Sequence, residues 1–248
     1  MKVAIRGMGR MGREVAEVIG TAEGIDLLTG IDPRGGGGLP CVAKLAELTD
    51  IEEKPDCIVD ISLHSEIEEL LTYAKAHQIP LVIGTTGFTE LEQAHIHAAS
   101  KHIPIFQSSN FSSGLSLLTS FARQVAKLLP DGDIEIVECH HREKRDAPSG
   151  TALALFSAIQ SARAGAEAKI GRNGDTPCKA GEVGIHSLRL GEAIGEHTLY
   201  ITTPTQQLVL RHTATSRRLF AEGALRAIQF ITRQRAALYG MEDLWERN

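Results

Sequence analysis

The first 107 residues alternate between short apolar runs and amphipathic segments. The apolar runs are rich in valine and isoleucine, which is typical of buried strands. Between them, apolar residues recur at helical spacing, as at Ile67, Leu70 and Leu71. The pattern predicts strands over residues 2–6, 25–31, 56–61, 80–83 and 104–107, and helices over 13–19, 42–54, 65–77 and 89–102. Strands that alternate with helices indicate a doubly wound parallel sheet.

The order of elements changes after residue 112. The pattern predicts a helix over 115–129, a strand over 133–139, a helix over 151–163, and strands over 184–190, 196–203 and 207–215. Consecutive strands favour an open, mostly antiparallel or mixed sheet. Residues 165–184 are polar and glycine-rich, which predicts a mobile excursion. Residues 217–239 return to a helical pattern, and we expect this helix to pack on the first domain.

These patterns together predict an α/β protein. Its fold class is a Rossmann-like doubly wound parallel sheet with an inserted α+β domain that carries an open mixed sheet. We expect residues 1–112 plus 218–248 to form one domain and residues 113–217 to form the insertion.

Composition limits the class of partner. The 248 residues carry a formal net charge of −5 and only 4% aromatic residues, which argues against nucleic acid. No apolar run approaches the roughly 20 residues that cross a bilayer, and the chain starts without a signal-peptide pattern. The four cysteines form no CxxC pair, so neither a zinc site nor a disulfide framework is indicated. We expect a soluble cytoplasmic protein that binds neither nucleic acid nor membrane.

A glycine motif follows the first predicted strand. Gly7–Gly12 reads GMGRMG, a GxGxxG between a strand and a helix, which is the context of a dinucleotide-binding turn. Asp32 follows the second strand, twenty residues after Gly12, where a carboxylate holds the ribose hydroxyl of NAD. Arg34 could meet a 2′-phosphate, so the sequence leaves NADH and NADPH both open. A plain glycine-rich turn is the alternative interpretation.

Two further loops lie at ends of predicted parallel strands. Gly84-Thr85-Thr86 follows the strand over 80–83, and Ser108-Ser109-Asn110-Phe111 follows the strand over 104–107. Such loops reach the nicotinamide half of a bound cofactor. A glycine turn with a capping threonine would account for the composition of the first loop as well.

The densest polar cluster lies between the strand over 133–139 and the helix over 151–163. His140 and His141 can transfer protons near neutral pH, and Lys144 supplies positive charge. Ser149-Gly150-Thr151 forms a helix start, whose backbone N–H groups suit a carboxylate or phosphate. The segment indicates a site for a small dianion that is protonated during reaction, although a solvated loop would carry similar residues. The chain thus predicts a nicotinamide-dependent oxidoreductase for a small anionic substrate.

The motifs also resemble those of the dihydrodipicolinate reductase family. The resemblance is carried by Gly7–Gly12, Gly84–Phe88, Asn110–Ser112 and the long segment Glu138–Thr151, and later by Gly195–Thr198 and Thr215–Arg217. It implies reduction of 4-hydroxy-tetrahydrodipicolinate to tetrahydrodipicolinate with NADH or NADPH, in the diaminopimelate route to lysine. It further implies a dinucleotide-binding first domain, an inserted domain that binds the small dicarboxylate substrate, and a homotetramer joined through the inserted sheets.

The resemblance also implies residue roles. His140 corresponds to the general acid/base and Lys144 to the proton donor or electrostatic partner. The expected substrate-binding residues are His141, Ser149, Gly150, Thr151 and Arg217. The expected cofactor-binding residues are Gly7, Met8, Gly9, Arg10, Met11, Asp32, Arg34, Gly84, Thr85, Thr86, Ser108, Ser109, Asn110 and Phe111. We expect no metal site.

Several alternatives remain open from the sequence. Arg217 lies at the return to the first domain, so an interdomain contact fits it as well as a substrate contact. His186, His197 and His212 lie on predicted strands, which favours structural roles. Ser62-Leu63-His64 stands where many family members carry a cofactor-binding arginine. A dehydrogenase for another small dicarboxylate or imine, or a nucleotide sensor without turnover, would share much of this pattern.

Overall fold

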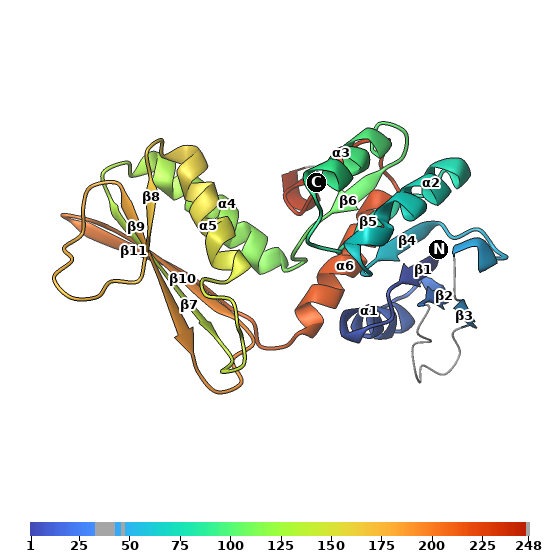
Figure 1. Ribbon diagram of the computed structural model, residues 1–248, viewed down its shortest axis with the longest axis horizontal. Coiled ribbons are helices and arrows are strands. Elements are labelled where there is room, and N and C mark those ends of the chain that lie inside the picture. Colours follow the sequence, from blue (N-terminus) through green and yellow to red (C-terminus); the bar gives the residue numbers. More distant parts are fainter. Residues whose placement is uncertain (33–42, 46–47, 247–248) are drawn as a thin grey trace. The chain divides into compact units, whose positions relative to one another are not determined.

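The computed structural model describes residues 1–32, 43–45 and 48–246 (Figure 1). The chain divides into two compact units. Unit 1 comprises residues 1–112 and 218–248, and unit 2 comprises residues 113–217. Among the described residues, no helix is both long and apolar enough to span a bilayer.

Unit 1 is built on a parallel sheet of seven strands in the order β12-β6-β5-β4-β1-β2-β3. The strands are β1 (Lys2–Arg6), β2 (Asp26–Ile31), β3 (Ala43–Leu45), β4 (Cys57–Asp60), β5 (Leu81–Ile83), β6 (Ile105–Gln107) and β12 (Leu238–Tyr239). The helices are α1 (Arg10–Gly20), α2 (Ile67–His77), α3 (Glu90–Ala99), α6 (Arg218–Ile231) and α7 (Asp243–Glu246), with short 3₁₀ turns η1 (Leu48–Asp50) and η2 (His64–Glu66). This order confirms the predicted doubly wound sheet.

Both faces of this sheet are covered, as Figure 1 shows. Because side chains alternate along a strand, Val3 and Ile5 of β1 pack with α1 and α6, whereas Ala4 packs with α2 and α3. The same alternation recurs on β4, where Val59 faces α1 and α6 and Ile58 faces the other layer. Burial on both faces explains why these strands are almost wholly apolar.

The strand order reverses between β1 and β4, because β2 and β3 extend the sheet on one side and β4, β5 and β6 on the other. In open α/β sheets, ligands bind at the carboxyl ends of the strands beside such a reversal. Gly7, Ile61 and Gly84 directly follow β1, β4 and β5, so they lie at the edge of unit 1 where folds of this kind bind a cofactor.

Two predictions for unit 1 were wrong. Residues 42–54 were expected to be helical, but Ala43–Leu45 forms β3 beside β2. Among the described residues of this span, the helical ones are Leu48–Asp50 alone. The helix expected over residues 217–239 ends at Ile231, and Leu238–Tyr239 forms β12 at the edge beside β6. In both places, pairing with a sheet edge outweighs local helix propensity.

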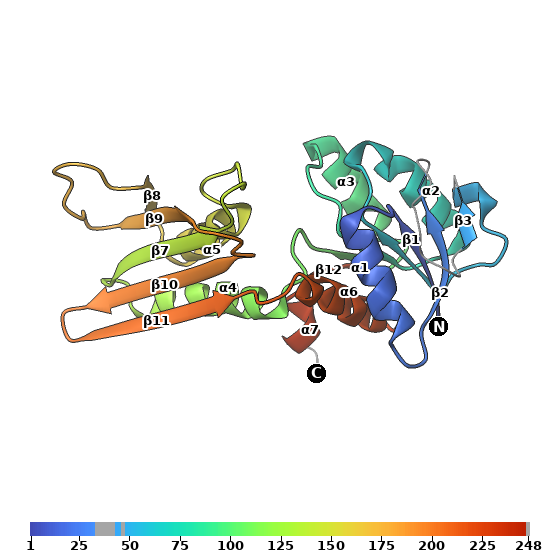
Figure 2. The same cartoon turned by 90° about the horizontal axis from the view of Figure 1, so that it is seen from below.

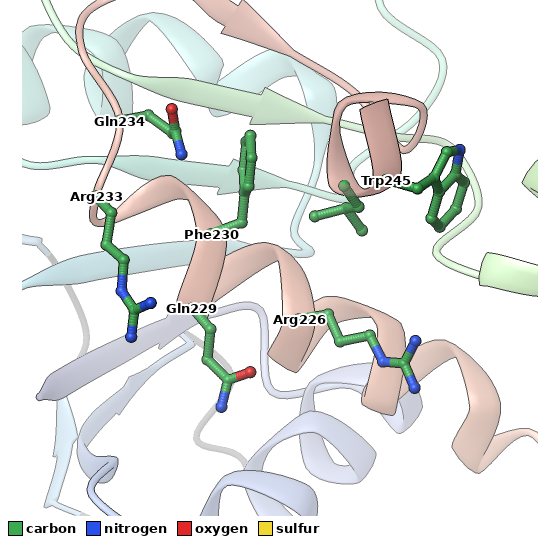
Figure 3. Close-up of a pocket in the computed structure, with 7 residues that line it drawn as sticks. Arg226, Gln229, Phe230, Arg233, Gln234 and Trp245 are labelled. Carbon is green, nitrogen blue, oxygen red and sulfur yellow. The ribbon is translucent and has the colours of Figure 1, made fainter. Parts of the chain in front are cut away.

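A surface pocket of about 360 Å³ lies between α6 and α7 (Figure 3). Arg226 and Arg233 of α6 line it together with the rings of Phe230 and Trp245. None of its lining residues belongs to the predicted cofactor or substrate sets, so it does not enter the candidate site.

Unit 2 contains a five-stranded sheet in the order β11-β10-β7-β9-β8 (Figure 2). Its strands are β7 (Asp133–His140), β8 (Glu167–Ile170), β9 (Glu182–Arg189), β10 (Glu196–Thr203) and β11 (Gln206–Thr213), and its helices are α4 (Ser113–Leu128) and α5 (Gly150–Ala162). The pairs β10–β11 and β10–β7 are antiparallel, whereas β7–β9 and β8–β9 are parallel. The expected open mixed sheet is therefore confirmed.

One face of this sheet is covered by α4 and α5. Ile134 and Ile136 of β7 and Leu199 of β10 pack against Leu118 of α4 and Leu155 of α5. The predicted mobile excursion over residues 165–184 was wrong in part, because Glu167–Ile170 forms strand β8 beside β9.

Candidate active site

Two glycines of the turn after β1 are required by the chain's own packing. Gly7 has a φ of +93°, and a Cβ there would lie 2.1 Å from the Ile61 carbonyl oxygen. A Cβ on Gly12 would lie 2.0 Å from the Gly7 carbonyl oxygen. Any side chain at either position would force the backbone apart, so β1, the turn and α1 can pack this closely only with glycine.

Gly9 is different, because no atom of the described chain would lie within 4 Å of a Cβ there. It is the N-cap residue of α1, with φ −69° and no side-chain cap, and it is exposed. The first N–H groups of α1 lack helical partners and carry positive potential. A glycine in open space beside such a helix start fits a bound pyrophosphate, which must approach the backbone closely.

Asp32 lies beside this turn at the end of β2. The Met8 backbone N–H donates to its Oδ2 at 3.0 Å, and the side chain is buried. The bond holds a carboxylate where a cofactor ribose would be recognised. Arg34, the candidate for a 2′-phosphate, lies outside the described residues, and NADH and NADPH both stay open.

A pocket of about 230 Å³ lies along the same edge of unit 1. Five of its lining residues were predicted to bind cofactor: Met11, Gly84, Ser109, Asn110 and Phe111. The other two, Ile61 and Phe220, were missed by sequence reasoning. Ile61 directly follows β4, so its place in the Rossmann pattern was a usable signal, whereas Phe220 comes from α6, more than a hundred residues after the loop it meets.

The loop after β6 is held by its own polar groups and by α6. The Ser108 hydroxyl donates to the Asn110 carbonyl oxygen at 2.7 Å, and Asn110 Oδ1 accepts from the Ser112 N–H at 2.8 Å. A Cβ on Gly223 of α6 would lie 1.8 Å from the Phe111 carbonyl oxygen. The loop therefore lies directly against the helix, which fixes the position of the Phe111 ring.

The loop after β5 is anchored by a buried carboxylate. Thr85 Oγ1 donates to Asp60 Oδ2 at 2.7 Å, and Ser62 Oγ donates to Asp60 Oδ1 at 2.6 Å. Burial raises the pKa of Asp60, and the two hydroxyl bonds and the Arg6 guanidinium partly oppose the shift. Thr85 thus faces the protein, whereas Thr86 is exposed. His64, in the segment that departs from the family pattern, contacts Glu92 at 3.0 Å.

In unit 2, His140 is the last residue of β7 and is buried. Its Nδ1 hydrogen-bonds to Oε2 of Glu138, a fully buried carboxylate two residues earlier on the same strand face. Burial lowers the pKa of His140, although Glu138 acts in the opposite direction. A neutral ring with its proton on Nδ1 leaves the Nε2 lone pair available. A Cβ on Gly195 would lie 3.2 Å from Nε2, so the glycine keeps space beside that atom.

Lys144 lies in the loop between β7 and α5, only partly exposed. Its Nζ donates to both oxygens of Asp146, at 2.8 and 2.9 Å. The pair keeps the ammonium in the same loop as His141, which is half-buried next to His140. The structure thereby brings a cation and two imidazoles into one strand-to-helix connection.

Ser149 caps α5, as the sequence predicts. Its Oγ accepts from the Ala152 N–H at 3.2 Å and lies 3.2 Å from Nε2 of His197. Gly150 and Thr151 form the first turn, where N–H groups lack partners within the helix. Burial lowers the pKa of His197 to about 3, so this ring is neutral and packs edge-on against His140, with ring centroids 5.2 Å apart.

Arg217 is not brought into this cluster by any contact among the described residues. It is exposed at the end of unit 2, directly before α6. The cluster instead contains Glu138, Arg189 and His197. None of the three was predicted as a site residue, and His197 was expected to have a structural role. A glutamate two positions before a histidine on a strand was a usable signal, but nothing in the local sequence pointed to Arg189. Among the described residues, no group of three or more His, Cys, Asp or Glu side chains could hold a metal ion.

Known proteins match nearly the whole chain. The family model described as dihydrodipicolinate reductase, N-terminus, matches residues 1–111, and the model for its C-terminus matches residues 114–245. A 4-hydroxy-tetrahydrodipicolinate reductase of Caldanaerobacter subterraneus subsp. tengcongensis is 39% identical over 239 residues, covering 95% of this chain and 94% of the relative. One from an Exiguobacterium species is 39% identical over 246 residues, covering 99% and 96%.

Solved structures show the same fold. Dipicolinate-bound dihydrodipicolinate reductase from Paenisporosarcina sp. TG-14 aligns with a TM-score of 0.85 at 26% identity, covering 98% of each chain. Diaminopimelate dehydrogenase of C. glutamicum aligns with a TM-score of 0.60 at 12% identity, over 97% of this chain and 92% of that one, a likeness of fold alone. With both family models matched and relatives above 30% identity over nearly the full length, this chain belongs to the dihydrodipicolinate reductase family.

Proposed function

We propose that this protein reduces 4-hydroxy-tetrahydrodipicolinate to tetrahydrodipicolinate, with NADH or NADPH, in the diaminopimelate route to lysine. The observation that carries the proposal is the β7–α5 connection of unit 2. It places a buried imidazole, a lysine ammonium and a capped helix start within twelve residues, from His140 to Thr151. This set suits a small dicarboxylate that must be bound and protonated, and family membership names that substrate.

Unit 1 supplies the cofactor site in this proposal. Gly9 and the first N–H groups of α1 hold the pyrophosphate, and Asp32 meets the adenosine ribose. The pocket lined by Met11, Gly84 and Phe111 receives the nicotinamide end. When bound, the dinucleotide supplies the hydride.

Unit 2 binds the substrate and supplies the groups that transfer a proton to it. The N–H groups of Gly150 and Thr151, with His141 and Ser149, bind the carboxylates. The 4-hydroxyl of the substrate leaves as water to give a conjugated imine. Hydride from the dinucleotide would then add to C4 and leave negative charge on the substrate, which the Lys144 ammonium stabilises. Lys144 Nζ then donates a proton, and His140 Nε2 acts as the acid or base that completes the transfer.

We further propose that unit 2 joins four copies of the chain and that the enzyme works in the cytoplasm. Leu188 and Val209 support a subunit contact, because both are 45% exposed. Leu188 of β9 pairs with Cys139, and Val209 of β11 pairs with Tyr200. Because side chains alternate along a strand, this register places Leu188 and Val209 on the sheet face opposite α4 and α5. Exposed apolar side chains on a sheet face favour burial against another copy.

A steady-state assay tests the function. The substrate is generated in situ, and oxidation of NADH and of NADPH is followed with wild-type protein and with His140→Ala. Turnover that falls about 10²–10⁴-fold in the variant supports the proposal. Absence of turnover by wild-type protein that still binds NADH would contradict it, and a panel of other dicarboxylates and imines would then be assayed.

A further inference from the structure

Arg189, the last residue of β9, contacts both parts of the candidate catalytic cluster. In the parallel pairing of β7 with β9, Arg189 lies opposite His140. Its Nη1 lies 3.1 Å from each carboxylate oxygen of Glu138. Its Nη2 donates to the Asp146 carbonyl oxygen at 2.6 Å, and its Nε donates to the Lys144 carbonyl oxygen at 3.3 Å.

These contacts link the His140 ring to the loop that carries Lys144. The Arg189 guanidinium contacts the Glu138 carboxylate, which in turn orients the His140 ring. Through the two carbonyl oxygens, it fastens the loop that carries Lys144. The Arg189 guanidinium is planar, and its N–H donors point in fixed directions. Through Glu138 it therefore favours one tautomer of His140, and through the carbonyl oxygens it fixes the position of the Lys144 backbone.

We propose that Glu138 and Arg189 form a positioning pair, which holds the His140 proton on Nδ1 and keeps His140 and Lys144 in one fixed arrangement. The proposal deepens the function proposed above and rests on it. Neither residue needs to touch the substrate. A misplacement of catalytic groups by about 1 Å can cost about 10²-fold in rate, so a pair of this kind has a measurable effect.

A purely structural role predicts a different outcome. Loss of a buried ion pair that serves only the fold would lower stability and leave the kcat and pH profile of the folded fraction unchanged. Loss of a positioning pair lowers kcat while the cofactor affinity of unit 1 stays the same. It also changes the titration of His140, whose ring faces Glu138 on β7, Arg189 on β9, His197 on β10 and Lys144 in the loop.

The direction of that change follows from the charges. The hydrogen bond and negative charge of Glu138 raise the pKa of His140, against the burial that lowers it. Glu138→Gln keeps the shape and removes the charge, so the pKa of His140 falls further. The limb of the pH profile that His140 controls then moves to lower pH, whether the ring acts as acid or as base.

Four variants test the proposal. Glu138→Gln and Arg189→Lys remove the carboxylate charge and the planar fork, respectively. Glu182→Gln and Arg172→Lys are matched controls, because Glu182 at the start of β9 and Arg172 in the loop after β8 form a carboxylate–arginine pair at 2.9 Å. We expect kcat to fall about 10- to 100-fold in the first two variants, with the Kd for NADH within about twofold of wild type and the controls unaffected. Equal kcat values in all four folded variants would overturn the proposal.

A second measurement does not depend on turnover. In protein labelled with ¹⁵N-histidine, ring-nitrogen shifts report which nitrogen carries the proton, and His140→Asn assigns the signals. We expect wild-type His140 to carry it on Nδ1 and Arg189→Lys to show a mixture of tautomers. An unchanged Nδ1 signal in Arg189→Lys would refute the positioning role of Arg189. Inactive wild-type protein with the expected tautomer would instead count against the proposed substrate.

Discussion

Gly9, Gly12 and Gly20 allow a prediction that separates effects on folding from effects on ligand binding. Gly12→Ala places a Cβ 2.0 Å from a backbone oxygen, Gly9→Ala places one in open space, and Gly20→Ala adds one at the exposed helix end, also with nothing within 4 Å. The first substitution collides with the chain itself. The second collides only with a ligand that approaches the helix start. The third serves as the matched control.

The expected magnitudes follow from these distances. Because a backbone atom cannot yield as a side chain does, Gly12→Ala should cost about 3 kcal/mol of unfolding free energy, near the upper end for overpacking. That corresponds to a Tm lower by roughly 6–12 °C. Gly9→Ala should cost less than about 1 kcal/mol, since its φ of −69° suits alanine and glycine is only a modest N-cap. Gly20→Ala should be neutral or stabilising by up to about 1 kcal/mol.

NADH binding should be weakened by Gly9→Ala and left unchanged by the Gly20→Ala control. A methyl group where the pyrophosphate lies costs about 1–3 kcal/mol, or roughly 5- to 150-fold in the Kd for NADH. Calorimetric titration with NADH and thermal unfolding without it measure the two quantities separately. If Gly9→Ala bound NADH as tightly as wild type, the pyrophosphate could not lie at the start of α1. A wild-type Tm for Gly12→Ala would show that the turn is not packed as described.

Three further predictions concern unit 2. Gly195→Ala adds a Cβ 3.2 Å from His140 Nε2, so kcat should fall about 10-fold at unchanged NADH affinity; an unaffected kcat would show that the space beside Nε2 is not used. Lys144→Ala should lower kcat by about 10²–10⁴-fold without weakening NADH binding, and a large loss of NADH affinity would mean that Lys144 has another role. His197 has a pKa of about 3 in the folded chain, compared with an ordinary value of 6.5. Between these two pH values, His197 is therefore protonated in the unfolded chain and neutral in the folded chain. The unfolding free energy should therefore fall as the pH drops from 6.5 towards 3, by up to about 1.4 kcal/mol per pH unit for this group. His197→Gln should flatten that part of the curve in urea titrations at several pH values, and an unchanged slope would contradict the assignment.

The sequence by itself determined most of the architecture. Alternating apolar runs and amphipathic segments predicted the parallel sheet of unit 1, because strands buried on both faces must be continuously apolar and the covering helices must be amphipathic. Consecutive strands predicted the mixed sheet of unit 2 in the same way. The glycine turn and the capped start of α5 were also evident, since both depend on residues close together in the chain.

Only the tertiary structure decided the remaining elements. Strands β3, β8 and β12 are short, and their residues carry weak local preferences. Each becomes a strand because an edge of a formed sheet offers unpaired N–H and C=O groups. Such groups are a property of the assembled sheet, which no local window of sequence contains.

The same reason explains the site. His140, Lys144 and Ser149 lie within ten residues of one another, so their pattern could be recognised directly. Arg189 follows His140 by 49 positions, and the two meet only because β7 pairs with β9 in a register that sets them side by side. The sequence determined which chemical groups are present, whereas strand register, a long-range property, decided which of them touch.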